Sequence, residues 1–270
     1  MASTPKTTAD VSSPDRQRDP LARGFEIIAL MVESGESSYG VRELGTYLGV
    51  SPSTAHRLLT DLEKLGMVRR SPDGSYQLGL EFLRLSWKLV SRFPLREMAN
   101  DLLQEMTDKS GESSFLGIYN DQRHEMMFAV TVDSPHPLRY MIPLQKWLPL
   151  HSGASGLSIL AFLPEETRRE ILQGNLTKVT ENTIVDPAIL SDRIEAIRRN
   201  GYAVSLGERV TGAIALAAPV FGPGQEVVGT SGLMIPESRF DARVETELSN
   251  LVKHSAAVLS ERMGGTLSRS

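Results

Sequence analysis

The sequence predicts an α/β protein of two domains: a small N-terminal domain rich in helices, and a larger domain that mixes helices with strands. Three observations support this prediction. The chain has 270 residues, 40% of them hydrophobic, which is enough to build two cores. Up to about residue 79, three short helical patterns precede two short strand patterns. Beyond Pro94, helical and strand patterns alternate.

Composition excludes several classes of protein. With no cysteine, the chain has no disulfide, no thiolate nucleophile and no zinc site built on sulfur, and its five histidines are the only soft ligands. No stretch reaches the roughly eighteen uninterrupted apolar residues of a membrane span, and the N-terminus does not have the basic-then-apolar order of a signal peptide. We therefore expect a cytoplasmic protein with no membrane partner.

Charge is distributed unevenly along the chain, although the net charge is only -4. Residues 16–92 carry eleven Lys and Arg against nine Asp and Glu, or +2. Residues 93–270 carry seventeen against twenty-two, or -5, and residues 1–15 add -1. Ordinary scatter of surface charge would also produce this difference, so it supports a nucleic-acid interaction of the first domain without establishing one.

Three short helices are expected in the N-terminal domain. Apolar residues recur at helical spacing from Phe25 to Val32, and the pattern stops at Ser34 and Gly35. A second helix covers residues 41–48. Ser51 then opens a third helix as its N-cap, with a proline at the first helical position.

The third helix divides sharply into two faces. Its apolar face is formed by Ala55, Leu58, Leu59, Leu62 and Leu65. Its other face is polar and is formed by Ser53, His56, Arg57 and Thr60. A helix that enters the major groove of DNA must show such polar side chains outward while its other face is anchored to a core. An ordinary amphipathic surface helix would have the same periodicity, but its place between two helices and a hairpin favours DNA binding.

A strand, turn and strand follow this helix over residues 67–70, 71–74 and 75–78, with a Pro-Asp-Gly turn, and predict a wing. Arg69 and Arg70 start there and could reach the DNA backbone or minor groove. Side chains alternate across a strand, so one of the two is expected to be structural or solvated. The residues expected at DNA are Ser51, Ser53, Thr54, His56, Arg57, Thr60, Arg69 and Arg70.

The periodicities divide the chain into five segments. These are a flexible tail (1–20), the winged domain (21–79), a linker helix (80–94), the larger domain (95–264) and a second tail (265–270). In the larger domain we expect strands at 115–119, 125–132, 138–143, 202–205, 213–220 and 227–235. Its later helices are expected at 152–162, 164–173, 187–199 and 240–262.

Sequence motifs in both domains resemble the IclR family of bacterial transcriptional regulators, and the likeness runs from about Arg23 to Arg262. In the first domain it is carried by residues 44–59, 65–68 and 76–79. In the second it is carried by residues 148–151, 159–164, 200–203, 217–220 and 238–240. The resemblance implies a winged helix-turn-helix joined by the linker helix to a GAF-like effector-binding domain. It also implies dimers or dimers of dimers on double-stranded operator DNA, a small-molecule effector, and repression or activation of metabolic operons.

The effector pocket can be carried over from the family position by position. The matching residues are Tyr140, Ala154, Ser155, Ser205, Ala213, Ala215, Gly232 and Met234. Relatives that bind small carboxylates tend to have polar groups on the last of these strands and an acidic residue near position 205, whereas this chain has Gly232, Met234 and Ser205 there. We therefore expect an effector larger and more apolar than a two- or three-carbon acid, because an unpaired charge is costly to bury. Ala213, Ala215 and Met234 would also suit an ordinary core.

Two alternatives remain from the sequence. A hydrolase is suggested by Gly-Ser-rich runs at 153–156 and 229–232, but neither fits the nucleophile-elbow spacing, and no phosphate-binding or dinucleotide fingerprint is present. His151 adjoins Ser152, but neighbouring residues seldom face each other, and His124 and His136 have no second metal ligand at a recognisable spacing. We expect no catalytic residue, metal or cofactor. The other alternative is a regulator whose C-terminal domain only oligomerises.

Overall fold

The computed structural model describes residues 19–92 and 95–265, and these two stretches form two separate compact units. The expected linker helix belongs to the first unit. The two expected tails lie mostly outside the described residues. Of the described part, Pro20 already starts the first helix, and Gly265 donates a backbone hydrogen bond to Ser260.

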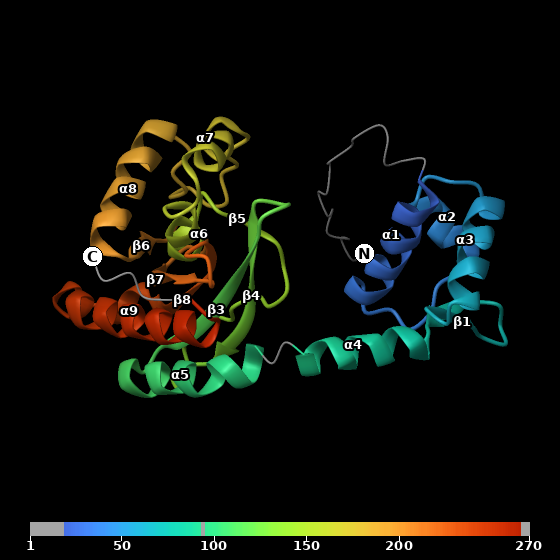
Figure 1. Cartoon of the computed structure of the whole chain (residues 1–270), viewed down its shortest axis with the longest axis horizontal. Helices are drawn as coiled ribbons and strands as arrows, with labels where there is room; N and C mark the ends of the chain where they lie inside the picture. Colours follow the sequence, from blue (N-terminus) through green and yellow to red (C-terminus); the bar gives the residue numbers. More distant parts are fainter. Residues whose placement is uncertain (1–18, 93–94, 266–270) are drawn as a thin grey trace. The chain divides into compact units, whose positions relative to one another are not determined.

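The N-terminal unit has the predicted order of three helices, a hairpin and a further helix (Figure 1). Its elements are α1 (Pro20–Glu33), α2 (Val41–Tyr47), α3 (Pro52–Lys64), β1 (Val68–Arg70), β2 (Tyr76–Leu78) and α4 (Leu80–Arg92). The strands β1 and β2 pair antiparallel, with Val68 opposite Leu78. Ile27, Leu44 and Leu59 are fully buried in one core that joins the three helices to Tyr76 of the hairpin. This packing fixes α3 on the surface of the unit.

The C-terminal unit is built on one antiparallel six-stranded sheet with strand order β5-β4-β3-β8-β7-β6. The strands are β3 (Ser113–Asn120), β4 (Glu125–Val132), β5 (Leu148–Pro149), β6 (Ala203–Leu206), β7 (Ala213–Phe221) and β8 (Val227–Pro236). The helices are α5 (Leu95–Ser110), α6 (Gly153–Leu160), α7 (Glu165–Gln173), α8 (Pro187–Asn200) and α9 (Glu245–Arg262).

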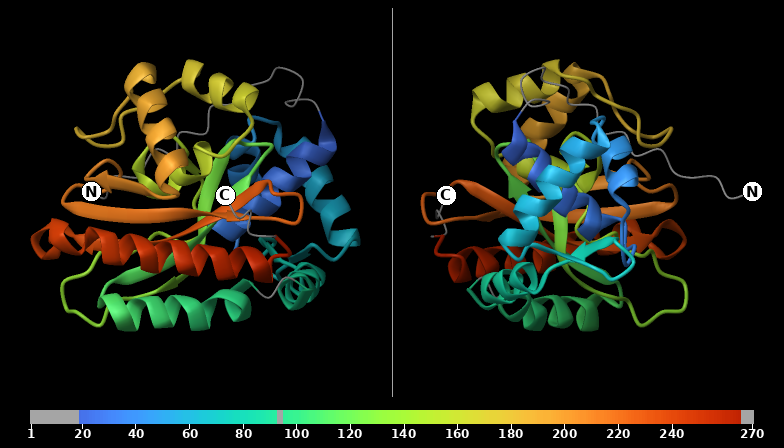
Figure 2. Two further views of the ribbon diagram at one scale, coloured as in Figure 1. Left: turned by 60° about the vertical axis from the view of Figure 1, so that its left-hand side comes forward. Right: turned by 90° about the vertical axis from the view of Figure 1, so that its right-hand side faces the viewer.

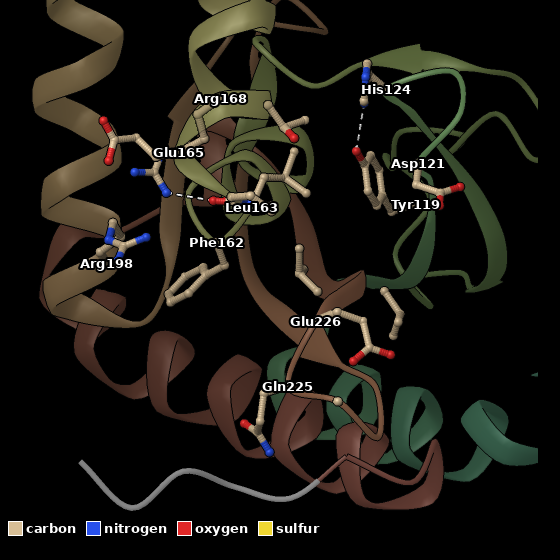
Figure 3. Close-up of a pocket in the computed structure, with 15 residues that line it drawn as sticks. Tyr119, Asp121, His124, Phe162, Leu163, Glu165, Arg168, Arg198, Gln225 and Glu226 are labelled. Carbon is tan, nitrogen blue, oxygen red and sulfur yellow. Dashed lines mark hydrogen bonds between the residues drawn. The ribbon is translucent and has the colours of Figure 1, made fainter.

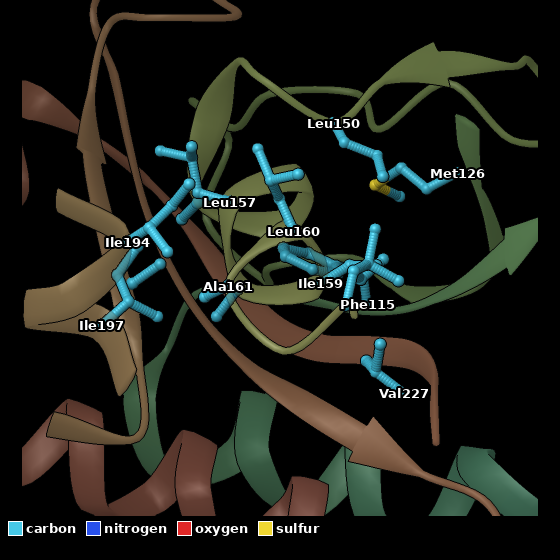
Figure 4. Close-up of a cluster of buried hydrophobic side chains, with 14 of the residues drawn as sticks. Phe115, Met126, Leu150, Leu157, Ile159, Leu160, Ala161, Ile194, Ile197 and Val227 are labelled. Atoms are coloured by element: carbon cyan, nitrogen blue, oxygen red, sulfur yellow. The ribbon is translucent and has the colours of Figure 1, made fainter. Parts of the chain in front are cut away.

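Helices cover both faces of this sheet (Figure 2). Helices α5 and α9 lie side by side on one face, where Leu103, Leu216 and Val252 are fully buried. Helix α6 packs against the opposite face, and α8 packs on α6. Figure 4 shows that second core, in which Leu157 and Leu160 of α6 lie with Ile194 and Ile197 of α8. The structure therefore has the α/β class expected from the sequence.

One of the expected elements is wrong, and another starts later than expected. Residues 138–143 form no strand, because Leu138 and Met141 are 65% and 73% exposed and Pro143 cannot donate a hydrogen bond to a ladder. The segment joins the sheet through one bridge, between Leu144 and Phe128, and the last strand on that side is the two-residue β5. The closing helix begins at Glu245, later than expected, after the 3₁₀ turns η2 (Glu237–Arg239) and η3 (Ala242–Val244).

Candidate nucleic-acid interface and effector cavity

Helix α3 begins with a dense set of capping interactions. The Ser51 hydroxyl accepts a hydrogen bond from the Thr54 amide at 3.2 Å. The same oxygen lies 2.9 Å from the hydroxyls of both Ser53 and Thr54. Since a serine N-cap replaces a missing intrahelical partner, Ser51 is used to start the helix, while Ser53 remains exposed for other contacts.

The two faces of α3 are separated as predicted along most of its length. Ala55, Leu58 and Leu59 are buried, whereas His56 and Arg57 are exposed. The Thr60 hydroxyl donates to the His56 carbonyl at 2.9 Å, so it is turned back to its own helix. Leu65 was expected on the buried face but is 65% exposed, because the helix has already ended at Lys64.

Arg57 and His56 have free side chains on the exposed face. Within the described part of the chain, neither side chain forms a hydrogen bond or ion pair with another residue. A guanidinium without an internal partner keeps all its donors for an outside acceptor, such as a phosphate or a guanine edge. The backbone below Arg57 is meanwhile fixed by the buried leucines. The Arg57 side chain can therefore reach such an acceptor without a rearrangement of the fold.

The wing places its two arginines in different surroundings. Arg70 lies opposite Tyr76, and its guanidinium carbon is 5.9 Å from the centroid of that ring. Arg69 lines a small surface hollow with Glu36 and Tyr39. The expectation that the two side chains point apart therefore agrees with their different neighbours. The turn between the strands is held by Asp73, whose pKa is lowered by the hydrogen bonds it accepts from Ser75.

An apolar groove of about 1280 Å³ crosses the same unit. It is lined by residues from α1, α3 and α4, among them Leu21, Phe25, Leu62, Leu65 and Leu89. Leu21, Phe25 and Leu89 are 68%, 69% and 58% exposed. Contiguous exposed apolar surface of this kind often marks an interaction site. The sequence did not predict the groove, because the periodicity placed Phe25 in the core pattern of α1.

In the C-terminal unit, a small cavity lies between the sheet and the start of α6. It includes six of the eight predicted effector residues: Ala154, Ser155, Ser205, Ala213, Ala215 and Met234. Tyr140 and Gly232 do not line it. The Tyr140 hydroxyl donates to the Thr211 carbonyl at 3.0 Å, and Gly232 is packed within the sheet where an added Cβ would lie 2.2 Å from the Leu216 oxygen.

Sequence reasoning missed the aromatic and charged part of this cavity. Phe115 and Phe128 line it, with ring centroids 4.9 Å apart, and so do Glu208 and Arg209. The cavity itself has about 20 Å³ of free space, which is room for a single water molecule. The signal available in the sequence was the pair of adjacent charges, Glu208 and Arg209, between Gly207 and Gly212.

A larger hollow of about 840 Å³ opens elsewhere on this unit (Figure 3). Phe162, Leu163, Arg168 and Arg198 line one side of it, and Tyr119 lies on another. Both arginines donate to carbonyls at the end of α6, Arg168 to Leu163 at 2.7 Å and Arg198 to Ala161 at 2.9 Å. Burial raises the pKa of Tyr119 to about 12. The two arginines therefore hold the chain just after α6, whereas the Tyr119 hydroxyl lies 3.0 Å from Nδ1 of His124.

Comparison with known proteins decides the family. The family described as "IclR helix-turn-helix domain" matches residues 20–72, and "Bacterial transcriptional regulator IclR C-terminal" matches residues 87–261. A glycerol operon regulatory protein from Streptomyces griseus is 31% identical over 92% of this chain and 98% of its own length. The chain belongs to the IclR family. It is a DNA-binding transcriptional regulator, and the family resemblance noted in the sequence is confirmed.

Solved IclR structures agree with this assignment. An IclR regulator from Silicibacter sp. matches with a TM-score of 0.79 and 25% identity, over 93% of this chain and 98% of that one. An IclR homologue from Microbacterium hydrocarbonoxydans, solved in complex with 4-hydroxybenzoate, has the same fold, with a TM-score of 0.76 and 21% identity over 91% and 99% of the two chains.

IclR proteins are transcriptional regulators and not enzymes, so the hydrolase alternative is discarded. In the part of the chain that the structure describes, no group of three His, Cys, Asp or Glu side chains is placed to hold a metal ion. None of the described helices is both long and apolar enough to cross a lipid bilayer.

Proposed function

We propose that this IclR protein is a cytoplasmic repressor or activator that reads an operator through α3 and its wing, and that a small molecule bound in the C-terminal unit controls this binding. The exposed face of α3 carries the proposal, because the side chains of Arg57 and His56 have no hydrogen-bond or ion-pair partner among the described residues, while the helix beneath them is anchored. Ser53 and Thr54 would contact phosphates beside them.

The effector is expected to have an apolar body larger than a two- or three-carbon acid. The rings of Phe115 and Phe128 and the side chain of Met234 offer such a body its surface. The 4-hydroxybenzoate of the Microbacterium homologue provides one probe of this class. At about 20 Å³ the cavity holds no organic molecule as it stands, so a ligand enters only if a lining side chain moves.

The operator-binding unit is proposed to be a homodimer formed through the apolar groove. Leu21, Phe25 and Leu89 are exposed next to one another along this groove, and an exposed apolar patch of this kind often marks a protein–protein contact. A second copy placed on this groove would also present two copies of α3 to the two half-sites of an operator.

The dimer is tested by light scattering coupled to size-exclusion chromatography. Phe25→Glu should shift the mass toward the monomer, because it places a charge in the apolar contact. Tyr47→Glu is the matched control, since Tyr47 is 59% exposed on the same unit but does not line the groove. A Phe25→Glu protein with the mass of the wild type would remove the groove from the interface.

The DNA-binding proposal is tested by fluorescence anisotropy of the full chain with DNA from upstream of its own gene and neighbouring genes. Salt should be fixed and an excess of unrelated DNA should be present, because nonspecific binding is strongly salt-dependent. Binding that withstands this competitor and changes when a metabolite is added supports both parts of the proposal. Specific binding that no metabolite alters favours a C-terminal unit that only oligomerises, and the absence of specific binding removes the operator assignment.

A further inference from the structure

The hollow of about 840 Å³ on the C-terminal unit lies where several elements end. One part of its wall is formed by the turn between β3 and β4 and the turn between β7 and β8, which are close because β3 pairs with β8. The other part comes from the chain after α6, from α7 and from the last turn of α8. Its volume is within the range of about 300–1000 Å³ that is usual for small-molecule sites. It shares no lining residue with the small cavity at the start of α6, so it is a separate place where a molecule could bind.

Two arginines lie on the α6 side of this hollow (Figure 3). Arg168 of α7 donates one N–H to the Leu163 carbonyl, and Arg198 of α8 donates one to the Ala161 carbonyl. The guanidinium carbon of Arg198 also lies 5.9 Å from the centroid of the Phe162 ring. A guanidinium has five N–H donors. Each arginine is therefore held in place by one bond while most of its donors remain for another acceptor.

Two carboxylates lie on the hairpin side. Asp121 belongs to the turn between β3 and β4, Glu226 belongs to the turn between β7 and β8, and both are exposed. In the part of the chain that the structure describes, neither carboxylate accepts a hydrogen bond or pairs with a cation. Glu165 also lines the hollow, but it is already paired with Arg169 at 2.8 Å.

Charges of both signs thus line one hollow without reaching each other. Opposite charges form an ion pair when N and O lie within about 4 Å. Within residues 19–92 and 95–265, no ion pair links the two arginines to the two carboxylates. The wall also includes the apolar side chains of Leu163 and Val227, which are buried. A molecule with a charge at each end and an apolar chain between them would give all four charges a partner and cover this apolar surface.

We propose that the hollow binds a linear zwitterion, a molecule whose carboxylate and ammonium groups are separated by an apolar chain. The carboxylate accepts charge-assisted hydrogen bonds from Arg168 and Arg198, and the ammonium donates to Asp121 and Glu226. An ω-amino acid has this chemistry, and so does a short peptide with free termini. An ordinary α-amino acid carries both charges on one carbon and does not suit a site with its charges on opposite sides. The inference does not depend on the effector proposed for the small cavity.

Isothermal titration calorimetry on the full-length protein tests the proposal with four probes. 6-Aminohexanoate has the carboxylate, the ammonium and the apolar chain. Hexanoate lacks the ammonium, hexylamine lacks the carboxylate, and leucine carries both charges on one carbon. 6-Aminohexanoate should bind at least about tenfold more tightly than each of the other three, as for a hydrogen bond to a charged group.

Glycylleucine, titrated in the same way, distinguishes the two sources of a linear zwitterion. Tighter binding of this dipeptide than of 6-aminohexanoate would identify short peptides as the ligands, and the reverse order would identify ω-amino acids. Either order supports a site for a linear zwitterion.

Paired substitutions assign each charge of the ligand to one side of the hollow. Asp121→Asn combined with Glu226→Gln should remove the advantage of 6-aminohexanoate over hexanoate and keep its advantage over hexylamine. Arg168→Gln combined with Arg198→Gln should do the reverse. A general loss of structure would weaken the binding of all probes and would not separate the two ends of the ligand.

The matched control combines Asp192→Asn with Arg199→Gln. Both residues are exposed on α8 and neither lines the hollow, so the affinity for 6-aminohexanoate should not change. Should the arginine pair fail to fold, the carboxylate pair still decides, because Asp121 and Glu226 have no partner among the described residues.

Three results would overturn the inference. The first is that neither 6-aminohexanoate nor glycylleucine binds the wild type. The second is that 6-aminohexanoate binds no more tightly than hexanoate and hexylamine, since the two sides would then not act together. The third is binding of 6-aminohexanoate that both paired variants leave unchanged, which would place the ligand elsewhere on the chain. Operator binding by the same preparation is a separate measurement, so each of these results would leave the proposed regulator intact.

Discussion

The exposed face of α3 and the cavity beside α6 carry their polar groups in opposite ways. On α3 the side chains of His56 and Arg57 are exposed and bind no other side chain or backbone group in the part of the chain that the structure describes. In the cavity, Glu208 and Arg209 are bonded to groups from α6, α8 and the segment before α6. On the exposed face of α3, side chains can be substituted without changing the fold. In the cavity, almost every group that could recognise a ligand also holds the domain together.

Substitution of Gly232 should have the largest effect on stability of the changes considered. It tests whether the C-terminal site tolerates substitution. An alanine Cβ at this position would lie 2.2 Å from the Leu216 oxygen and 2.6 Å from the Phe115 ring. Gly232→Ala should therefore lower the free energy of unfolding by about 3 kcal/mol, as for overpacking of a close-packed core. Chemical denaturation of the full chain measures it.

Gly174→Ala provides the control for this change. Gly174 follows α7 and has negative φ, and its added Cβ would come no closer than 3.3 Å to another atom. It should cost much less than Gly232→Ala. If Gly232→Ala were as stable as the wild type but altered effector binding, Gly232 would return to the list of ligand contacts that the sequence predicted.

Arg57→Ala should give the next largest effect, this time on binding alone. Loss of a base-reading arginine should weaken specific operator binding by about 1 to 3 kcal/mol, while nonspecific binding changes far less. The thermal unfolding midpoint should not move, because the Arg57 side chain is exposed and has no partner within residues 19–92 and 95–265. Anisotropy with operator and scrambled DNA separates the two kinds of binding.

Lys64→Ala is the control on the same helix, since Lys64 is exposed at the far end of α3 and paired with Asp61. It should leave the preference for operator DNA unchanged. An Arg57→Ala protein with full operator affinity would show that the specific contact lies elsewhere on the unit.

The sequence predicted the first site better than the second for a physical reason. The faces of α3 follow from a local period of 3.6 residues, so Leu58 and Arg57 could be separated without knowing the fold. The cavity instead collects residues from five separate stretches of chain, and nothing local indicates that Phe115 and Arg209 meet. The family resemblance supplied positions such as Ser155 and Met234. It could not supply Arg209, which was not among the positions carried over.

The same reasoning explains the wrong strand at residues 138–143. The alternation of apolar residues there resembles a half-buried strand, but Met141 is exposed and the segment is held by side-chain contacts of its own. Arg239 donates to the Leu138 carbonyl at 2.7 Å, and Tyr140 donates to the Thr211 carbonyl at 3.0 Å. These contacts come from residues far along the chain, so a local pattern could not predict them.

Alanine substitutions in the wing should have a smaller effect on DNA binding. They distinguish contacts to bases from contacts to the DNA backbone. Arg70 lies next to the turn, whereas Arg69 shares its hollow with the acidic Glu36. Arg70→Ala should weaken binding to all DNA sequences alike and reduce the salt slope by about 1, as for a phosphate contact. Arg69→Ala should leave the slope unchanged. The measurement is binding affinity over a series of salt concentrations, and the reverse result would assign the contact to Arg69.

The smallest expected effect concerns an exposed ion pair of the C-terminal unit, where stability depends on charge without any link to ligand binding. Arg262 of α9 donates to both carboxylate oxygens of Asp101 on α5, at 2.6 and 2.7 Å. These bonds lower the pKa of Asp101 from 3.8 to about 2. Because the folded-state pKa is the lower one, the pair stabilises the fold fully above about pH 3.8 and loses its contribution as the pH falls through about 2.

Asp101→Asn should therefore be slightly less stable than the wild type at neutral pH, and the difference should vanish in acid. A difference in unfolding midpoint that persists at the lowest pH would show that Asp101 acts through packing or capping of α5, and not through its charge.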